Sequence, residues 1–162
     1  REGKYEIDWD VEHEVVLVQP FMSYVVHDAV AQAGAAERLP ELCRRWSQFL
    51  VDGYDTLGEC WDYGTHVHGW SSTPARDLVF HTLGVTPAEP GYGVARIAPR
   101  LGPLGWVRGR VPTPRGMVSL EMDAHWLVLE SPVPVVLNLA GRGESHLPAG
   151  CHEIRVDQPP SQ

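Results

Sequence analysis

The chain has 162 residues, of which 43% are hydrophobic and 21% are charged, values typical of a globular protein. This composition excludes a disordered chain, a collagen and a pure coiled coil, and no apolar stretch approaches the about 20 residues that cross a membrane. The net charge of −8 disfavours binding to nucleic acid and to anionic membrane surfaces, so we expect neither as a partner.

The start of the sequence and its cysteines indicate the cellular setting. The chain begins at Arg1 with no signal-peptide pattern, so we expect a piece of a longer polypeptide that is located in the cytoplasm. Cys43, Cys60 and Cys151 are widely spaced and form no CxxC pair, a pattern that predicts buried free thiols instead of disulfides or a zinc site.

Three helices are expected in the first half. Residues 5–17 alternate between apolar and acidic side chains, which predicts a half-buried extended segment. The spacing then changes at Pro20 to that of a helix, with Gly34 at its end. The apolar face predicted for this helix consists of Phe21, Tyr24, Val25, Ala29 and Ala33.

The next two helices are expected over residues 37–51 and 69–83, with Gly53 and Gly84 as their stops. Leu39, Leu42, Cys43, Trp46, Phe49 and Leu50 form the apolar face of the first of these helices. The apolar faces of these helices need more partners than this chain provides.

Short strands are expected in the second half, where eleven of the fourteen prolines occur. They cover residues 94–97, 106–110, 117–122, 125–129, 133–139 and 151–156. Their spacing of roughly ten residues predicts an antiparallel β-sandwich. The fold class is therefore α+β, with a helical segment at 1–85, a linker at 86–91 and a sandwich domain at 92–157.

The loop at 58–70 carries the densest group of chemically active side chains: Glu59, Trp61, His66, His68 and Trp70. Three interpretations remain open from spacing alone. Glu59 is the general base of a glycoside hydrolase, with tryptophans stacking on a sugar. His66 and His68 bind a metal with Glu59 or His81. The group is aromatic packing with surface histidines.

Several motifs resemble the C-terminal part of bacterial α-L-rhamnosidases of glycoside hydrolase family 78. They are Gly58-Glu59-Cys60-Trp61, His68-Gly69-Trp70-Ser71, the run at 83–91, Ile97-Ala98-Pro99, Gly105, Thr113-Pro114-Arg115-Gly116 and, upstream, Gln19-Pro20-Phe21. The ordered series covers residues 15–156. The resemblance implies the last helices of an (α/α)6 catalytic barrel, followed by a small C-terminal β-sandwich.

The resemblance also implies roles for the loop residues in an inverting hydrolysis of terminal α-L-rhamnosides. Glu59 would be the general base that activates water, and His68 would contact the sugar, with His66 as the other candidate. Trp61 and Trp70 would line the sugar site. The general acid of the family lies upstream in the barrel, so we expect this chain to be inactive alone. No metal and no organic cofactor is expected.

Two other functions remain as alternatives. The first is a non-catalytic carbohydrate-binding module with a sugar platform made of Trp106, His125 and Trp126, although we expect both tryptophans to lie in the core. The second is an assembly piece, in which exposed helical faces dock onto the missing upstream part of the same polypeptide.

Overall fold

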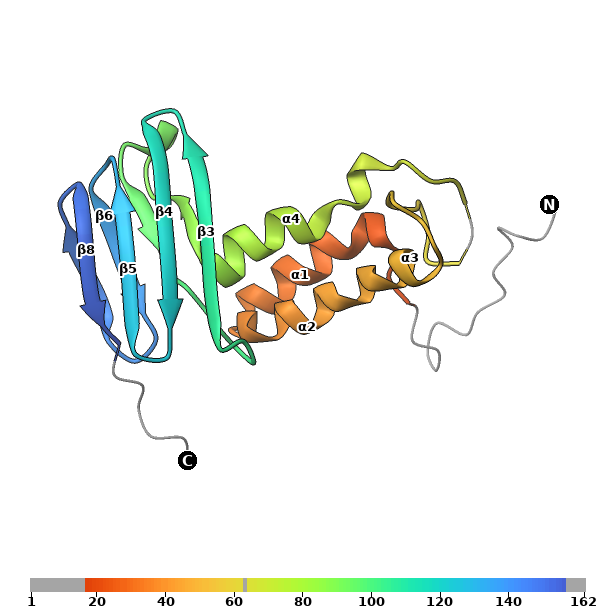
Figure 1. Cartoon of the computed structure of the whole chain (residues 1–162), viewed down its shortest axis with the longest axis horizontal. Helices are drawn as coiled ribbons and strands as arrows, with labels where there is room; N and C mark the ends of the chain where they lie inside the picture. The colour runs from red at the N-terminus through yellow and green to blue at the C-terminus, as the bar shows by residue number, and fades with distance from the viewer. Residues whose placement is uncertain (1–16, 63, 157–162) are drawn as a thin grey trace.

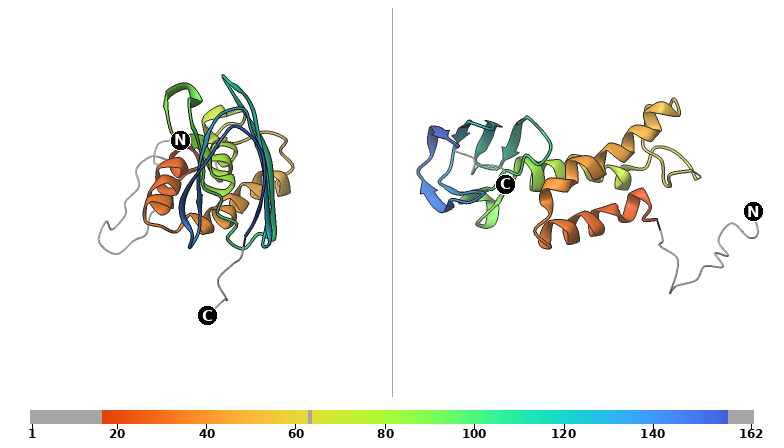
Figure 2. Two further views of the ribbon diagram at one scale, coloured as in Figure 1. Left: turned by 90° about the vertical axis from the view of Figure 1, so that its left-hand side faces the viewer. Right: turned by 90° about the horizontal axis from the view of Figure 1, so that it is seen from below.

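The computed structural model of the chain describes residues 17–62 and 64–156. A group of helices and a β-sandwich lie end to end along the long axis of the molecule (Figure 1), and the right-hand view of Figure 2 shows the same arrangement from below. The predicted α+β class is confirmed. The extended segment expected over residues 5–17 lies outside the described residues, except for Leu17.

The helices occupy the three predicted regions, but they are built from short pieces. The first region contains the 3-10 turn η1 (Pro20–Met22) and α1 (Ser23–Gln32). The second contains η2 (Ala36–Arg38), α2 (Leu39–Cys43), η3 (Arg44–Trp46) and α3 (Ser47–Val51). The third contains η4 (Gly69–Ser71), α4 (Thr73–Asp77) and the π-helical turn η5 (Leu78–Leu83). Each predicted stop, Gly34, Gly53 and Gly84, has a positive φ.

Helix α1 turns its polar side inward, contrary to the prediction. Ser23 and His27 are buried, whereas Phe21, Tyr24 and Val25 are 44%, 40% and 45% exposed. The periodicity located the helix correctly, but the described residues supply no neighbour that covers its apolar side. An apolar stripe of this kind on a helix is normally packed against another element.

Helices α2 and α3 bury most of the predicted apolar face. Leu39, Cys43, Trp46 and Phe49 are buried, although Leu50 is exposed. The Trp46 ring meets the Trp61 ring edge-on at 4.9 Å between centroids, and Phe49 stacks on Trp61 at 5.7 Å. This aromatic cluster is the main apolar core of the helical part.

The sandwich consists of two four-stranded sheets, in the orders β1-β2-β6-β7 and β3-β4-β5-β8. The strands are β1 (Val85–Pro87), β2 (Ala95–Ile97), β3 (Trp106–Thr113), β4 (Gly116–Asp123), β5 (Trp126–Ser131), β6 (Val135–Leu139), β7 (Gly143–Leu147) and β8 (Gly150–Arg155). The pairs are antiparallel except β2 with β6. Strands β1 and β7 were not expected from the sequence.

In the β3-β4-β5-β8 sheet, the core forms by alternation of inward and outward side chains along the strands. On β5, for example, Leu127 and Leu129 are completely buried, while Trp126 and Val128 point outward and are exposed. The inward side chains of both sheets and of the adjoining loop residues join in one continuous hydrophobic cluster. Leu83, at the end of η5, is also part of it, so the last helix is anchored in the sandwich.

Two glycines show how closely the helices and the sandwich approach each other. Gly84 ends η5 with φ +74°, and a Cβ there would lie 2.2 Å from the backbone carbonyl of Ala98. A Cβ on Gly102, with φ +56°, would lie 2.1 Å from the carbonyl oxygen of Glu37. Both positions therefore exclude a side chain. Within the described residues, no helix combines the length and the apolar character needed to cross a bilayer.

The cysteines are all free, but they differ in exposure. Cys43 is buried, and burial, followed by the nearby charge of Asp77, raises the pKa of its thiol to about 12. Cys60 is half-buried, and Cys151 on β8 is exposed. The prediction of buried thiols is therefore confirmed for Cys43 and wrong for Cys151, because alternation along β8 places Cys151 on its outer face.

Candidate functional site

The loop after α3 closes into a short irregular hairpin that carries the predicted site residues. Its two sides are joined by hydrogen bonds from the Glu59 N–H to the Thr65 carbonyl at 2.9 Å and from the His68 N–H to the Leu57 carbonyl at 3.0 Å. Gly58 and His66 form a bridge pair between them. Positive φ at Gly64 (+96°) and Val67 (+69°) allows the backbone to turn there.

Glu59 lies half-buried on this hairpin. Its side chain packs on the backbone of Gly64, since a Cβ at Gly64 would lie 3.0 Å from the Glu59 Oε2. Among the described residues, no side chain forms an ion pair or a hydrogen bond with this carboxylate. Its oxygens are therefore available to accept a hydrogen bond from water or from a ligand hydroxyl.

His66 and Trp61 line one cavity of about 310 Å³, together with Phe49, Asp52, Tyr54, Cys60, Asp62 and Gly64. The His66 ring stacks on Tyr54 with 3.5 Å between centroids. Its Nδ1 is buried and has no hydrogen-bond partner among the described residues. Trp61 is mostly buried: its Nε1 donates to the Val18 carbonyl at 2.7 Å, and the Arg45 guanidinium lies over its ring.

His68 and Trp70 form a second group, at the start of the third helical region. The His68 Nε2 shares a 2.6 Å hydrogen bond with Thr65 Oγ1, and its ring lies 4.8 Å from the ring of Trp70. Trp70 is 54% exposed and also contacts Phe21 of η1, at 5.4 Å. These rings form an exposed aromatic surface that is continuous with the apolar side of α1.

The structure thus places the five predicted residues in separate groups, on the hairpin and on η4 directly after it. Trp61 and His66 line the cavity, His68 and Trp70 belong to the exposed aromatic surface, and Glu59 lies on the hairpin strand between Gly58 and Cys60. In the described part of the chain, no hydrogen bond or ring contact joins Glu59 to either histidine. The acidic side chains of the segment expected over residues 5–17, such as Asp8, Asp10 and Glu12, lie outside the described residues.

The metal interpretation of His66 and His68 gains no support from the described residues. The possible three-ligand group found there consists of Asp28, Asp77 and His81, whose ligand atoms lie within 4.8 Å of one another. Both carboxylates of this group already pair with a cationic side chain. The Arg76 guanidinium donates to both oxygens of Asp28, at 2.7 and 3.1 Å, and to Asp77 at 2.8 Å.

This group is a polar network around the buried Asp77 that spacing did not reveal. The Asp77 side chain is fully buried and accepts a 2.7 Å hydrogen bond from His27 Nδ1, which ties α1 to α4. Asp28 accepts from His81 at 2.9 Å. The hydrogen bond from Arg76 is the main reason that the pKa of Asp28 is lowered. The sequence signal that could have indicated this network is the occurrence of two charged dipeptides, His27-Asp28 and Arg76-Asp77, within predicted helices.

The expectation that Trp106 and Trp126 lie in the core is wrong. They are 61% and 44% exposed, because strand alternation puts Val107 and Leu127 inside and the tryptophans outside. Both line a groove on the outer face of the β3-β4-β5-β8 sheet. His125 is exposed in the turn before β5 but does not line this groove.

Of the three comparisons with known proteins, only the one with solved structures gives matches. No protein-family profile matches the chain, and no curated protein sequence matches it. A GH78 family rhamnosidase of Bacillus sp. GL1 matches 76% of this chain with a TM-score of 0.67 and 27% identity. An α-L-rhamnosidase from Aspergillus terreus matches 82% of it, with a TM-score of 0.67 and 22% identity.

A third solved structure has a weaker likeness. The α-L-rhamnosidase of Streptomyces avermitilis, complexed with L-rhamnose, matches 69% of the chain with a TM-score of 0.56 and 17% identity. The chain spans 15%, 18% and 15% of these three proteins, so it corresponds to a small part of each. The resemblance inferred from the sequence motifs is thereby confirmed: in fold, most of this chain is similar to a portion of the family 78 α-L-rhamnosidases, consistent with a C-terminal portion.

Proposed function

We propose that this chain is the C-terminal portion of an inverting glycoside hydrolase that removes terminal α-L-rhamnose, and that it supplies the general base Glu59. The observation that carries the proposal is the likeness to the Bacillus rhamnosidase, at 27% identity over 76% of this chain. The ordered motifs around Glu59 and His68 point to the same class. The substrate is therefore a carbohydrate with a terminal α-L-rhamnoside.

The exposed apolar side of the helical part supports a missing upstream partner. Phe21, Tyr24 and Val25 of η1 and α1, with Trp70 of η4, leave aromatic and aliphatic groups in contact with solvent. Large apolar patches on a surface mark sites of protein interaction. We take this surface as the contact with the rest of an (α/α)6 barrel, contributed by an N-terminal part of the same polypeptide.

Within such an enzyme, the chemistry of Glu59 is that of a base. An inverting hydrolase needs two carboxyl groups roughly 6.5–9.5 Å apart, with the attacking water between them. Glu59 would accept a proton from that water, while an acid from the upstream part protonates the leaving oxygen. His68, backed by Thr65, would orient the sugar, with His66 as the other candidate, and Trp61 and Trp70 would form walls. Neither a metal nor an organic cofactor is needed, and a cytoplasmic location remains part of the proposal.

Two measurements test this function. The intact mass of the native polypeptide should be several times 18.0 kDa, since the general acid must come from elsewhere in it. In that longer polypeptide, Glu59→Gln should lower kcat for p-nitrophenyl α-L-rhamnoside by about a hundredfold or more, with a smaller change in KM.

Glu41→Gln is the matched control, because Glu41 is an exposed carboxylate on α2. It should retain full activity. The product should be the β-anomer of L-rhamnose, as detected by NMR immediately after cleavage. A native mass near 18.0 kDa, or full activity in Glu59→Gln, would refute the proposal.

A further inference from the structure

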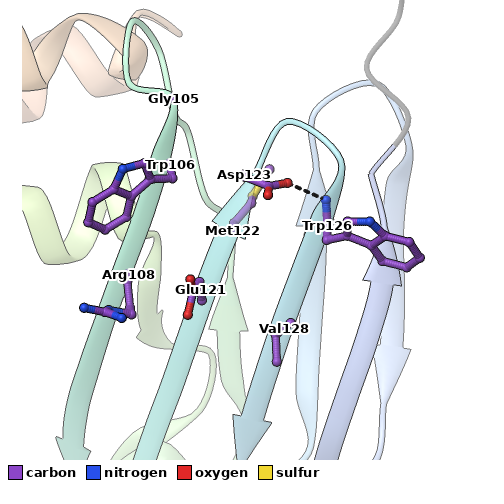
Figure 3. Close-up of a pocket in the computed structure, with 8 residues that line it drawn as sticks. All are labelled: Gly105, Trp106, Arg108, Glu121, Met122, Asp123, Trp126 and Val128. Atoms are coloured by element: carbon purple, nitrogen blue, oxygen red, sulfur yellow. Dashed lines mark hydrogen bonds between the residues drawn. The ribbon is translucent and has the colours of Figure 1, made fainter.

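The groove on the outer face of the sandwich is independent of the helical site and of the function proposed for it. It has a volume of about 550 Å³ and is lined by Gly105, Trp106, Arg108, Glu121, Met122, Asp123, Trp126 and Val128. Figure 3 shows Trp106 and Trp126 on the same side of the sheet, at either side of the β4 residues Glu121 and Asp123. We propose that this groove binds a neutral saccharide chain, with the two indoles as stacking surfaces.

The register of the strands fixes the spacing of the two indoles. Trp106 on β3 lies opposite Asp123 on β4, and the Trp126 N–H donates to Asp123 Oδ1 at 2.8 Å. The two tryptophans are thus in one row and two strands apart, roughly 10 Å at the usual strand separation. That distance separates the indoles enough to engage successive parts of one extended ligand.

Hydrogen bonds order the backbone at Trp126, and a cation lies near the Trp106 ring. Asp123 Oδ1 also accepts from the His125 N–H at 2.7 Å, so one carboxylate fastens the whole turn that carries Trp126. The Arg108 guanidinium lies 5.9 Å from the Trp106 ring, within the range of a cation–π contact. Groups that are ordered before binding lose less conformational freedom when a ligand arrives.

The polar groups between the indoles suit a ligand rich in hydroxyls. Arg108 and Glu121 face each other across β3 and β4, yet among the described residues neither side chain has an ion-pair or hydrogen-bond partner. A guanidinium donates hydrogen bonds and a carboxylate accepts them. Together they can therefore pair with both the oxygen and the hydrogen of a sugar hydroxyl. Apolar walls with a few convergent polar groups are typical of small-molecule sites.

The charges of the groove favour a neutral ligand over a charged one. Its lining has one cation, Arg108, and two carboxylates, Glu121 and Asp123. A polyanion would be repelled by the carboxylates, and a purely apolar partner would leave Arg108 and Glu121 desolvated without partners. A saccharide combines apolar ring faces with neutral donors and acceptors, which matches both features of the lining.

Affinity electrophoresis of the full 162-residue chain tests this proposal. Native gels would contain galactomannan, arabinoxylan or mixed-linkage β-glucan as neutral probes, and polygalacturonate as the charged one. We expect retardation by at least one neutral polysaccharide. Trp106→Ala and Trp126→Ala should each weaken it about tenfold or more, as expected when an aromatic anchor is removed. Glu121→Gln should weaken it less.

Met117→Ala is the matched control, because Met117 is an exposed apolar residue on the same β4 face but outside the groove. It should bind as the unchanged chain does. Circular dichroism and thermal unfolding verify that all variants remain folded. We expect them to fold because both indoles are exposed and their removal leaves the core intact. The absence of retardation by any neutral polysaccharide, or retention unchanged in both tryptophan variants, would overturn the proposal. Sedimentation that shows a dimer dissociated by Trp126→Ala would overturn it too, and would identify the face as an interface between copies.

Discussion

On β5 of the sandwich, Leu127 and Leu129 are fully buried, whereas on α1 the polar Ser23 and His27 are buried and the apolar Val25 is exposed. The sandwich contains a continuous apolar core shared by both sheets. The helical part instead depends on a small aromatic cluster and on the polar network around Asp77. The sandwich thus completes its own core within the described residues, whereas these residues leave the apolar side of α1 uncovered.

The largest expected effect concerns the core of the sandwich. Leu129→Ala removes a fully buried side chain, so it should lower the free energy of unfolding by about 3–4 kcal/mol. Val128→Ala, its exposed neighbour, should change it by less than about 0.5 kcal/mol. Urea unfolding measures both values. Hydrogen exchange should locate the loss of protection in β3, β4 and β5, and equal costs for the two variants would contradict the assigned core.

The second effect concerns the polar network around the buried Asp77 in the helical part. Asp77→Ala leaves Arg76 and the buried His27 without their shared partner and should cost about 3 kcal/mol. Asp55→Ala, at an exposed carboxylate in the loop after α3, should cost less than about 0.5 kcal/mol. Hydrogen exchange in α1 should rise in the first variant alone. A large cost without loss of protection in α1 would show that the network does not hold this helix.

The third effect is a pH dependence of the free energy of unfolding, caused by the Asp28–Arg76 pair of the helical part. The Arg76 guanidinium lowers the pKa of Asp28 below its unfolded value, so the stabilisation is complete above about pH 5. It is lost as the pH falls below about 4, through the folded pKa. Because Asp28 is partly exposed, we expect at most about 1 kcal/mol.

Urea unfolding at pH 5 and at pH 3 measures this loss. Asp28→Asn should remove part of the fall in stability between the two pH values. Glu41→Gln, at an exposed carboxylate on α2, should leave it unchanged. An identical fall in all three proteins would exclude a contribution from the Asp28 pair.

The regions also differ in how well the sequence predicted them. Short β-like runs at regular spacing located β3, β4 and β5, because these strands pack in a core that lies within the chain. Strand β7 was missed because Gly143–Leu147 is exposed on nearly every side chain, so no pattern marks it. Strand β1 was missed because it is only three residues long and contains Pro87, so its sequence resembles that of a linker.

For the candidate site, the motifs gathered Glu59, His66 and His68 on one hairpin, but spacing could not tell which of them share a cavity. Val67, between the two histidines, has a left-handed backbone conformation. A β-branched residue rarely adopts this conformation, so the sequence provides no reason to expect it there. The network of Asp28, Arg76 and Asp77 depends on contacts across about 50 positions of the sequence, which local periodicity cannot register.

The smallest expected effect tests whether the polar side of α1 is buried, and its apolar side exposed, in solution as in the structure. Val25→Ser should change the free energy of unfolding by less than about 0.5 kcal/mol, because Val25 buries little surface in this chain. Ser23→Ala, on the opposite side of the same helix, removes the 2.9 Å hydrogen bond from Ser23 Oγ to the Gln19 carbonyl and should cost about 1 kcal/mol. An ordinary amphipathic helix would give the reverse order, with the apolar residue more costly to replace. That reverse order, measured by urea unfolding at low protein concentration, would mean that the apolar side of α1 is covered in solution by this chain itself, and the argument for an upstream partner would fail.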